Sequence, residues 1–110
     1  MTTMPLHEEL AGGRWHLFGL SEQLGHIGSE ISRALSAQTA GNTQRMNAAL
    51  DRALELFDLT IADPKHHGRL REICRAREVV CDFFYGGNNY HSTGASLDRY
   101  FTQFAIATRR

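Results

Sequence analysis

Apolar residues recur at intervals of three and four in four separate stretches of the chain, which is the period of an amphipathic α-helix. Glycine pairs and two prolines separate these stretches. We predict helices over residues 21–39 and 43–62, a third from Asp63–Pro64 to the glycines at 86–87, and a fourth capped by Thr93. Because the connections are short, neighbouring helices should run antiparallel, which predicts an all-α, four-helix up-down bundle over residues 21–110.

Residues 1–20 precede the first predicted helix and form a separate N-terminal arm in this interpretation. Trp15, Leu17 and Phe18 make part of it too apolar for a free tail. We therefore expect the arm, or a short extra helix within it, to pack across the bundle, over the second apolar face of the third helix.

The third predicted helix carries apolar residues on two faces. One face holds Leu70, Ile73, Cys74, Cys81 and Phe84, and the other holds Ala76, Val79 and Phe83. A helix that is apolar on two sides must be covered twice. We therefore place Ala76, Val79 and Phe83 at an interface, with a dimer or higher homo-oligomer as the expected assembly.

Small residues line one face of the first predicted helix: Gly25, Gly28, Ser29, Ser32 and Ser36. A glycine inside a helix costs about 1 kcal/mol relative to alanine, so this face suggests close approach of another backbone. The expected partner is a helix, either of the same bundle or of a second copy. A ligand lying on the exposed backbone and a plain serine-rich solvent face remain alternatives.

Charge balances over the whole chain, with 12 Lys+Arg against 12 Asp+Glu, which excludes binding to nucleic acid or anionic membranes by bulk charge. The third helix is locally basic, and its residues His66, His67, Arg69, Arg71 and Arg75 could hold an anion or a nucleic acid. Pairing with the acids of the second helix, Asp51, Glu55 and Asp58, is the competing interpretation. Arg77 lies within an apolar stripe, so we expect an ion pair with Glu30 or Glu55, with an inward anion site as the alternative.

Metal and cofactor chemistry finds little support in the sequence. No Glu-x-x-His pair of the di-iron bundle type occurs, so we predict no metal site and no cofactor. Cys74 and Cys81 are too far apart in one helix to bridge, and we expect both to be buried. The start of the chain does not resemble a signal peptide and no apolar run could span a membrane, so a cytoplasmic location without membrane contact is expected.

The segment between the third and fourth helices combines turn-forming and aromatic residues. Tyr85, Asn88, Asn89, Tyr90 and His91 could form a recognition loop, because exposed aromatic residues often anchor interfaces. An ordinary interhelical loop is the alternative.

Three runs resemble a set of small uncharacterised prokaryotic helical proteins: residues 56–64, 77–86 and 98–101. The resemblance covers about residues 21–108 and implies a helical fold, with no activity and no site residue attached. HEPN-type ribonucleases are helical bundles of similar size, but they place an arginine four to six residues before a histidine, and this chain has no such pair.

These observations together favour a non-enzymatic, self-associating bundle that acts as an accessory or protein–protein interaction module, with no catalytic residues. The alternative is a bundle that binds RNA or another anion through its basic third helix, including an atypical ribonuclease.

Overall fold

A computed structural model describes residues 13–108, and this part of the chain is helical without strands. Four α-helices follow one another: α2 (Leu20–Thr39), α3 (Thr43–Ile61), α4 (Leu70–Phe84) and α5 (Gly94–Ala107). Two short 3-10 helices accompany them, η1 (Arg14–Leu17) before α2 and η2 (Pro64–Arg69) before α4. The prediction of an all-α helical bundle is therefore confirmed.

Side-chain caps explain where the helices begin. The Asn42 side chain accepts a hydrogen bond from the Arg45 amide at the start of α3, and Thr93 forms a reciprocal capping box with Ser96 at the start of α5. Gly41 turns the chain between α2 and α3 with a φ of 72°, a value that favours glycine. The predicted third helix is interrupted, because Asp63 caps η2 and the backbone leaves helical geometry at His66.

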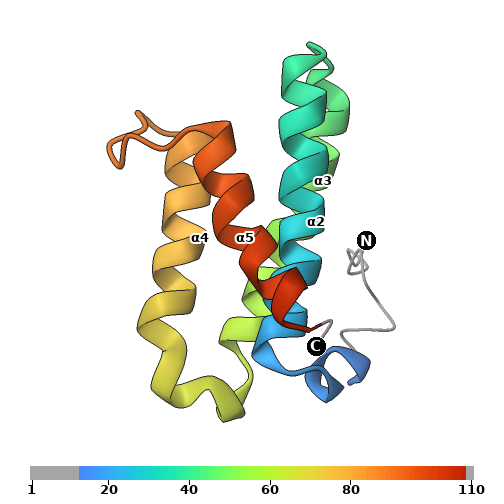
Figure 1. The fold of residues 1–110 in the computed structure, drawn as a ribbon, viewed down its shortest axis with the longest axis vertical. Helices are drawn as coiled ribbons and strands as arrows, with labels where there is room; N and C mark the ends of the chain where they lie inside the picture. Colours follow the sequence, from blue (N-terminus) through green and yellow to red (C-terminus); the bar gives the residue numbers. More distant parts are fainter. Residues whose placement is uncertain (1–12, 109–110) are drawn as a thin grey trace, which may run out of the picture.

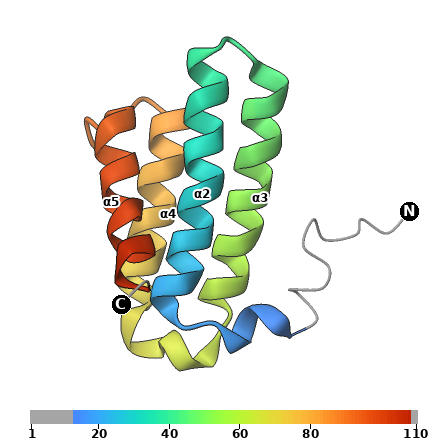
Figure 2. The same cartoon turned by 45° about the vertical axis from the view of Figure 1, so that its right-hand side comes forward.

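The α2–α3 pair lies beside the α4–α5 pair, and successive helices run in opposite directions (Figures 1 and 2). The helices α2 and α3 make a long hairpin, α5 packs along α2, and α4 packs against α3. Ile27, Ile31, Leu50, Phe57 and Val80 are fully buried at the centre. None of the helices in residues 13–108 is long and apolar enough to cross a membrane.

The crossing of α2 and α5 uses the small-residue face of α2. A Cβ atom at Gly28 would lie 2.5 Å from the Cβ of Phe101, and one at Gly25 would lie 3.4 Å from the Ala105 backbone. Ser32 donates a hydrogen bond to Asp98 of α5, whereas Ser29 and Ser36 are exposed. The tight crossing predicted at the two glycines therefore lies inside the chain.

The N-terminal segment takes a different place from the one expected. Trp15 in η1 is 1% exposed and its indole N–H donates to Thr60 of α3, so η1 covers the end of the α2–α3 hairpin and not the second face of α4. Residues 1–12 of the predicted arm lie outside the described residues. The anchor is long-range, because Trp15 and Thr60 are 45 positions apart.

The face of α4 that is buried differs from both of the apolar faces predicted for this helix. Its buried residues are Ile73, Ala76 and Val80, a face that lies between the two stripes. Cys74 is exposed and Cys81 is only partly covered, so the expectation that both thiols are buried is wrong. Val79 and Phe83 are half-buried and pack against the core.

Candidate functional site

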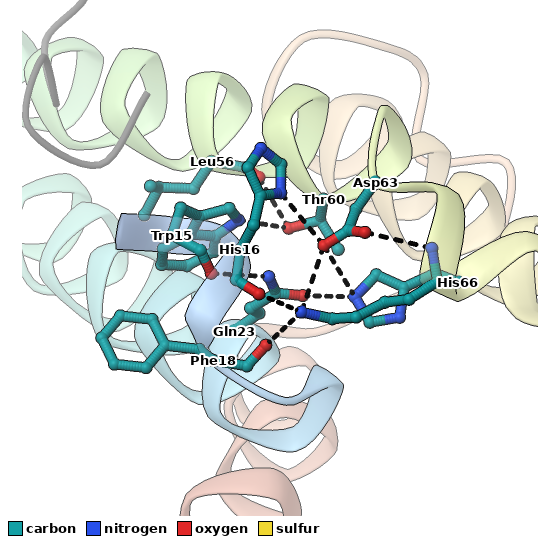
Figure 3. A network of polar contacts seen from close by, with 9 residues as sticks. Trp15, His16, Phe18, Gln23, Leu56, Thr60, Asp63 and His66 are labelled. Atoms are coloured by element: carbon teal, nitrogen blue, oxygen red, sulfur yellow. Dashed lines mark hydrogen bonds and ion pairs between the residues drawn. The ribbon is translucent and has the colours of Figure 1, made fainter. Parts of the chain in front are cut away.

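A network of buried polar groups joins η1, α2, α3 and η2 at one end of the bundle (Figure 3). Gln23, Thr60, Asp63 and His66 are all buried, with at most 6% of each residue exposed. Buried polar groups are costly unless they are hydrogen-bonded, so their partners decide what this network does.

Asp63 is the charged centre of the network. Its carboxylate accepts hydrogen bonds from the Lys65 amide at 3.0 Å and from Nδ1 of His16 at 3.0 Å, and its Oδ2 lies 3.2 Å from the Lys65 ammonium. Burial raises the pKa of the carboxyl, but these hydrogen bonds and the Lys65 charge outweigh it and lower the pKa to about 2. Asp63 is therefore ionised across the physiological pH range.

Lys65, the only lysine of the chain, connects η2 to η1. Its ammonium donates to the backbone carbonyls of His16 and of Phe18, the latter at 2.8 Å. These contacts satisfy carbonyl groups at the end of η1 that have no helical partner of their own. The ammonium therefore faces the protein, so the structure does not direct it towards a bound anion.

His66 and Gln23 extend the network into the core. The Gln23 amide donates to the carbonyl of Trp15 at 3.0 Å, so its oxygen accepts from Nε2 of His66 at 2.6 Å. This arrangement assigns the proton of the neutral imidazole to Nε2. Burial, with the positive charges of Lys65 and Arg69, lowers the pKa of His66 despite the opposing effect of Asp63.

The network positions backbone segments, and its partners are internal to the protein. Trp15 donates to the Thr60 hydroxyl, which in turn donates to the Leu56 carbonyl (Figure 3). The Asp63–His16 pair orients one imidazole, as a carboxylate does beside a general base. We assign the network a structural role, because its contacts hold η1 and η2 on the hairpin.

An apolar groove opens between α4 and α5. Its volume is about 270 Å³, and its walls are Ala76 and Val79 of α4 with Leu97, Tyr100 and Phe101 of α5. Two of the interface residues predicted from the sequence, Ala76 and Val79, thus line a groove that α5 covers only in part. Phe83 lies one turn beyond Val79 and packs edge-on against Phe84.

Charged side chains of alternating sign border this groove. Glu72 and Arg75 both line it. Arg69 pairs with Glu72 at 2.6 Å and Arg75 with Glu78 at 3.6 Å; Glu72 is half-buried and the other three side chains are exposed. The Arg75 guanidinium also lies over the Tyr90 ring, 5.5 Å from its centroid.

The basic residues predicted to bind an anion do not form one surface. His66 is buried in the polar network, whereas His67 and Arg71 are exposed. Arg69 of η2 pairs with Glu72 of α4, and Arg75 pairs with Glu78 within α4. Arg77 pairs with Asp58 of α3 at 3.0 Å and is 35% exposed, so its partner is neither of the two acids expected and the side chain does not face the core.

The predicted recognition loop folds around Asp82. The Asp82 carboxylate accepts from the backbone amides of Asn89 and Tyr90, and Asn88 exchanges two hydrogen bonds with the Ser92 backbone. Asn88 and His91 have positive φ values near 53°. Tyr85 and Tyr90 are 55% and 41% exposed, so this ordered loop presents two aromatic rings.

Sequence reasoning missed Asp63, Gln23 and Lys65 as members of one cluster. Asp63 was recognised as a helix cap, and that local role is correct. The missing signal is long-range, since Gln23 meets His66 across 43 positions. A polar Gln23 beside the buried Leu24 was the one local indication.

Searches for similar proteins give no match. No protein-family model matches the chain, and no curated protein or solved structure is significantly similar to it. Within residues 13–108, no group of three or more His, Cys, Asp or Glu side chains is arranged to hold a metal ion. The functional interpretation therefore rests on the surfaces of the molecule.

Proposed function

We propose that the protein is a self-associating interaction module, not an enzyme, in which α4 packs antiparallel on α4 of a second copy. The interface would extend over the groove between α4 and α5. Supporting this, Val79 and Tyr100 are half-buried apolar residues at the surface of the groove, where a second copy would remove them from water.

The order of charges along α4 is the observation that carries the proposal. Glu72 and Arg75, opposite in charge and three residues apart, both line the groove. When such a pattern is turned by a two-fold axis through its centre, Glu72 of one copy faces Arg75 of the other, and Arg75 faces Glu72. A two-fold interface needs a self-complementary surface of this kind.

The charges would set the register, and apolar burial would supply most of the affinity. Exposed ion pairs contribute about 0.2–1 kcal/mol each, so the existing Arg69–Glu72 and Arg75–Glu78 pairs can be exchanged for pairs between copies at little cost. A stable dimer buries about 800 Å² per copy. The groove, with Phe83 one turn beyond Val79 and Tyr90 beside Arg75, supplies the apolar part of that area.

A charge exchange tests the proposal. Glu72→Arg places arginines opposite one another and should shift the protein towards the monomer in sedimentation velocity. The double variant Glu72→Arg with Arg75→Glu exchanges the two charges but keeps the pair self-complementary, so it should recover the dimer. A double variant no more associated than the single variant would exclude this register.

A second pair of variants tests the apolar part of the interface. Val79→Glu should weaken association, because it places a carboxylate in the groove. Cys74→Glu makes the same charge change at an exposed position of the same helix and should leave association unchanged. Equal behaviour of the two variants would contradict an interface at the groove.

Binding of RNA or another anion by the basic residues of η2 and α4 has less support, because that set is divided between buried, paired and exposed positions. It predicts RNA binding that falls steeply with salt and is lost in the Arg71→Ala, Arg75→Ala double variant. Salt-insensitive or undetectable binding would exclude it.

A further inference from the structure

A second groove runs between α2 and α3, and basic residues form its walls. Its volume is about 790 Å³. Arg33 of α2 and Arg45 and Arg52 of α3 line it, and Ala37, Ala40, Ala48 and Ala49 contribute small side chains. This groove belongs to the α2–α3 hairpin and is separate from the self-association surface proposed above.

A buried carboxylate holds two of the arginines in place. Glu30 is 8% exposed; its Oε1 accepts from Arg33 at 2.9 Å and its Oε2 from Nε of Arg52 at 2.9 Å. Each guanidinium contributes one N–H group to Glu30 and keeps others for a further acceptor. The third arginine, Arg45, has no ion pair among residues 13–108, so the groove has an excess of positive charge.

The spacing of the arginines matches the repeat of a helix. Arg45 and Arg52 are seven residues apart on α3, which is two turns or about 10.5 Å along the axis. A helix lying parallel to α3 would match them with acidic residues seven positions apart on one of its own faces. The alanines allow such a helix to approach the backbones of α2 and α3 closely.

The lining residues also distinguish a helix from a single-stranded nucleic acid. No aromatic side chain lines the 790 Å³ groove itself, so bases lying along Arg45 and Arg52 would have no ring to stack on. Beyond Arg33 lies a second hollow of about 320 Å³. It shares Arg33, and its other lining residues are the polar His26, Ser29 and Glu30, the half-buried Phe18 and the buried Trp15 and Leu56. The Phe18 side chain offers an apolar contact next to the basic one, as an amphipathic ligand requires.

We propose that the groove between α2 and α3 binds an acidic amphipathic helix of a partner protein, whose carboxylates pair with Arg45 and with the Arg33–Arg52 pair. The affinity would come from charge-assisted hydrogen bonds to Arg45 and to the two arginines that Glu30 has already oriented. Apolar residues of the same helix would pack on the alanines and enter the hollow beside Arg33. Binding therefore needs both negative charge and helical spacing.

The test uses two synthetic peptides and the full-length protein. The first is a fluorescent alanine-rich helix of about 18 residues with two glutamates seven positions apart and leucines on the same face. The second has the same composition, but one glutamate is moved two positions to the opposite face. Fluorescence anisotropy should show about tenfold tighter binding of the first peptide, and the binding should weaken with added salt.

Variants of the protein locate the binding. Arg45→Glu should weaken binding of the first peptide about tenfold, because it replaces attraction by repulsion. A peptide with lysine in place of the matching glutamate should recover binding to that variant. Arg99→Glu makes the same charge change on the exposed surface of α5 and should have no effect.

Two results would overturn the proposal. One is equal or undetectable binding of the two peptides. The other is binding of an oligouridylate of about 15 nucleotides that depends on Arg45 and exceeds binding of the first peptide, which would make the groove a nucleic-acid site.

Discussion

Asp63 illustrates how one side chain can hold two short helices that would not be stable alone. Its carboxylate caps η2 through the Lys65 amide and binds His16 of η1. Because it is buried, removal of its charge would leave the Lys65 ammonium with one acceptor fewer and His16 without its partner. The energetic consequence should therefore be seen in the dependence of stability on pH.

We predict that Asp63→Asn lowers the free energy of unfolding at pH 7 by roughly 2 kcal/mol. The pKa of the carboxyl falls from 3.8 to about 2 on folding, so its contribution is complete above pH 3.8 and disappears as the pH falls towards 2. As the pH falls from 3.8 towards 2, urea unfolding should show a smaller loss of unfolding free energy for Asp63→Asn than for the wild type. Asp58→Asn, at an exposed ion pair, should change stability at pH 7 much less, and an equal effect would contradict the role of Asp63.

His66 should produce a separate pH effect nearer neutrality. Its pKa is lowered on folding from 6.5, so its contribution is complete above pH 6.5 and is lost as the pH falls through the folded value. His66→Gln should reduce the slope of unfolding free energy against pH below 6.5. The exposed neighbour substitution His67→Gln should keep the wild-type slope, and the same flattening in both variants would refute this assignment.

The two glycines of the α2–α5 crossing should respond differently to alanine. Gly28→Ala should destabilise by about 1–3 kcal/mol, because its Cβ would overlap Phe101. Gly25→Ala meets Ala105 at ordinary contact distance and should be neutral or stabilising by up to about 1 kcal/mol. Thermal unfolding of both variants would measure this, and equal melting temperatures would contradict the packing of Phe101 on Gly28.

Among the elements, the helices were predictable where local signals mark their ends. The predicted end of the first helix at Thr39 and the predicted start of the second at Thr43 agree with the observed bounds of α2 and α3. The turn at Gly41 and the Asn42 cap that set these bounds involve only residues close in sequence. The break at His66 was missed, since the Asp63–Pro64 signal is the same for a 3-10 and an α-helix. Helix type there depends on tertiary contacts of Lys65 and His66.

The orientation of α4 was harder to predict than its extent. Apolar residues surround much of this helix, so the pattern allowed more than one buried face, and Val80 was left out of both predicted stripes. The place of η1 and the grooves depends on pairs such as Trp15 with Thr60 and Glu30 with Arg52, which are far apart in sequence. Periodicity along one helix contains no information about such pairs.

The corrected orientation of α4 predicts different reactivity of the two thiols. Cys74 is exposed, whereas Cys81 is partly covered and has Arg77 3.9 Å from its Sγ. Maleimide labelling of the native protein, followed by peptide mass spectrometry, should modify Cys74 first. Faster labelling of Cys81 would show that α4 is rotated relative to this structure.

At the scale of the whole molecule, a net charge of zero conceals two differently organised surfaces. At the groove between α4 and α5, Glu72 and Arg75 carry opposite charges one turn apart, which suits contact with an identical surface. In the α2–α3 groove, two of the three arginines share one buried glutamate and Arg45 has no ion pair among residues 13–108, which suits an acidic partner. A dimer formed through α4 would present two copies of that groove.

The mass in solution tests self-association most directly. Light scattering at tens of micromolar should give twice the chain mass of 12.4 kDa for the wild type, falling towards 12.4 kDa on dilution. Val79→Glu should remain near the single-chain mass at the concentration where the wild type is a dimer. A wild type that stays at 12.4 kDa throughout would contradict the proposed function.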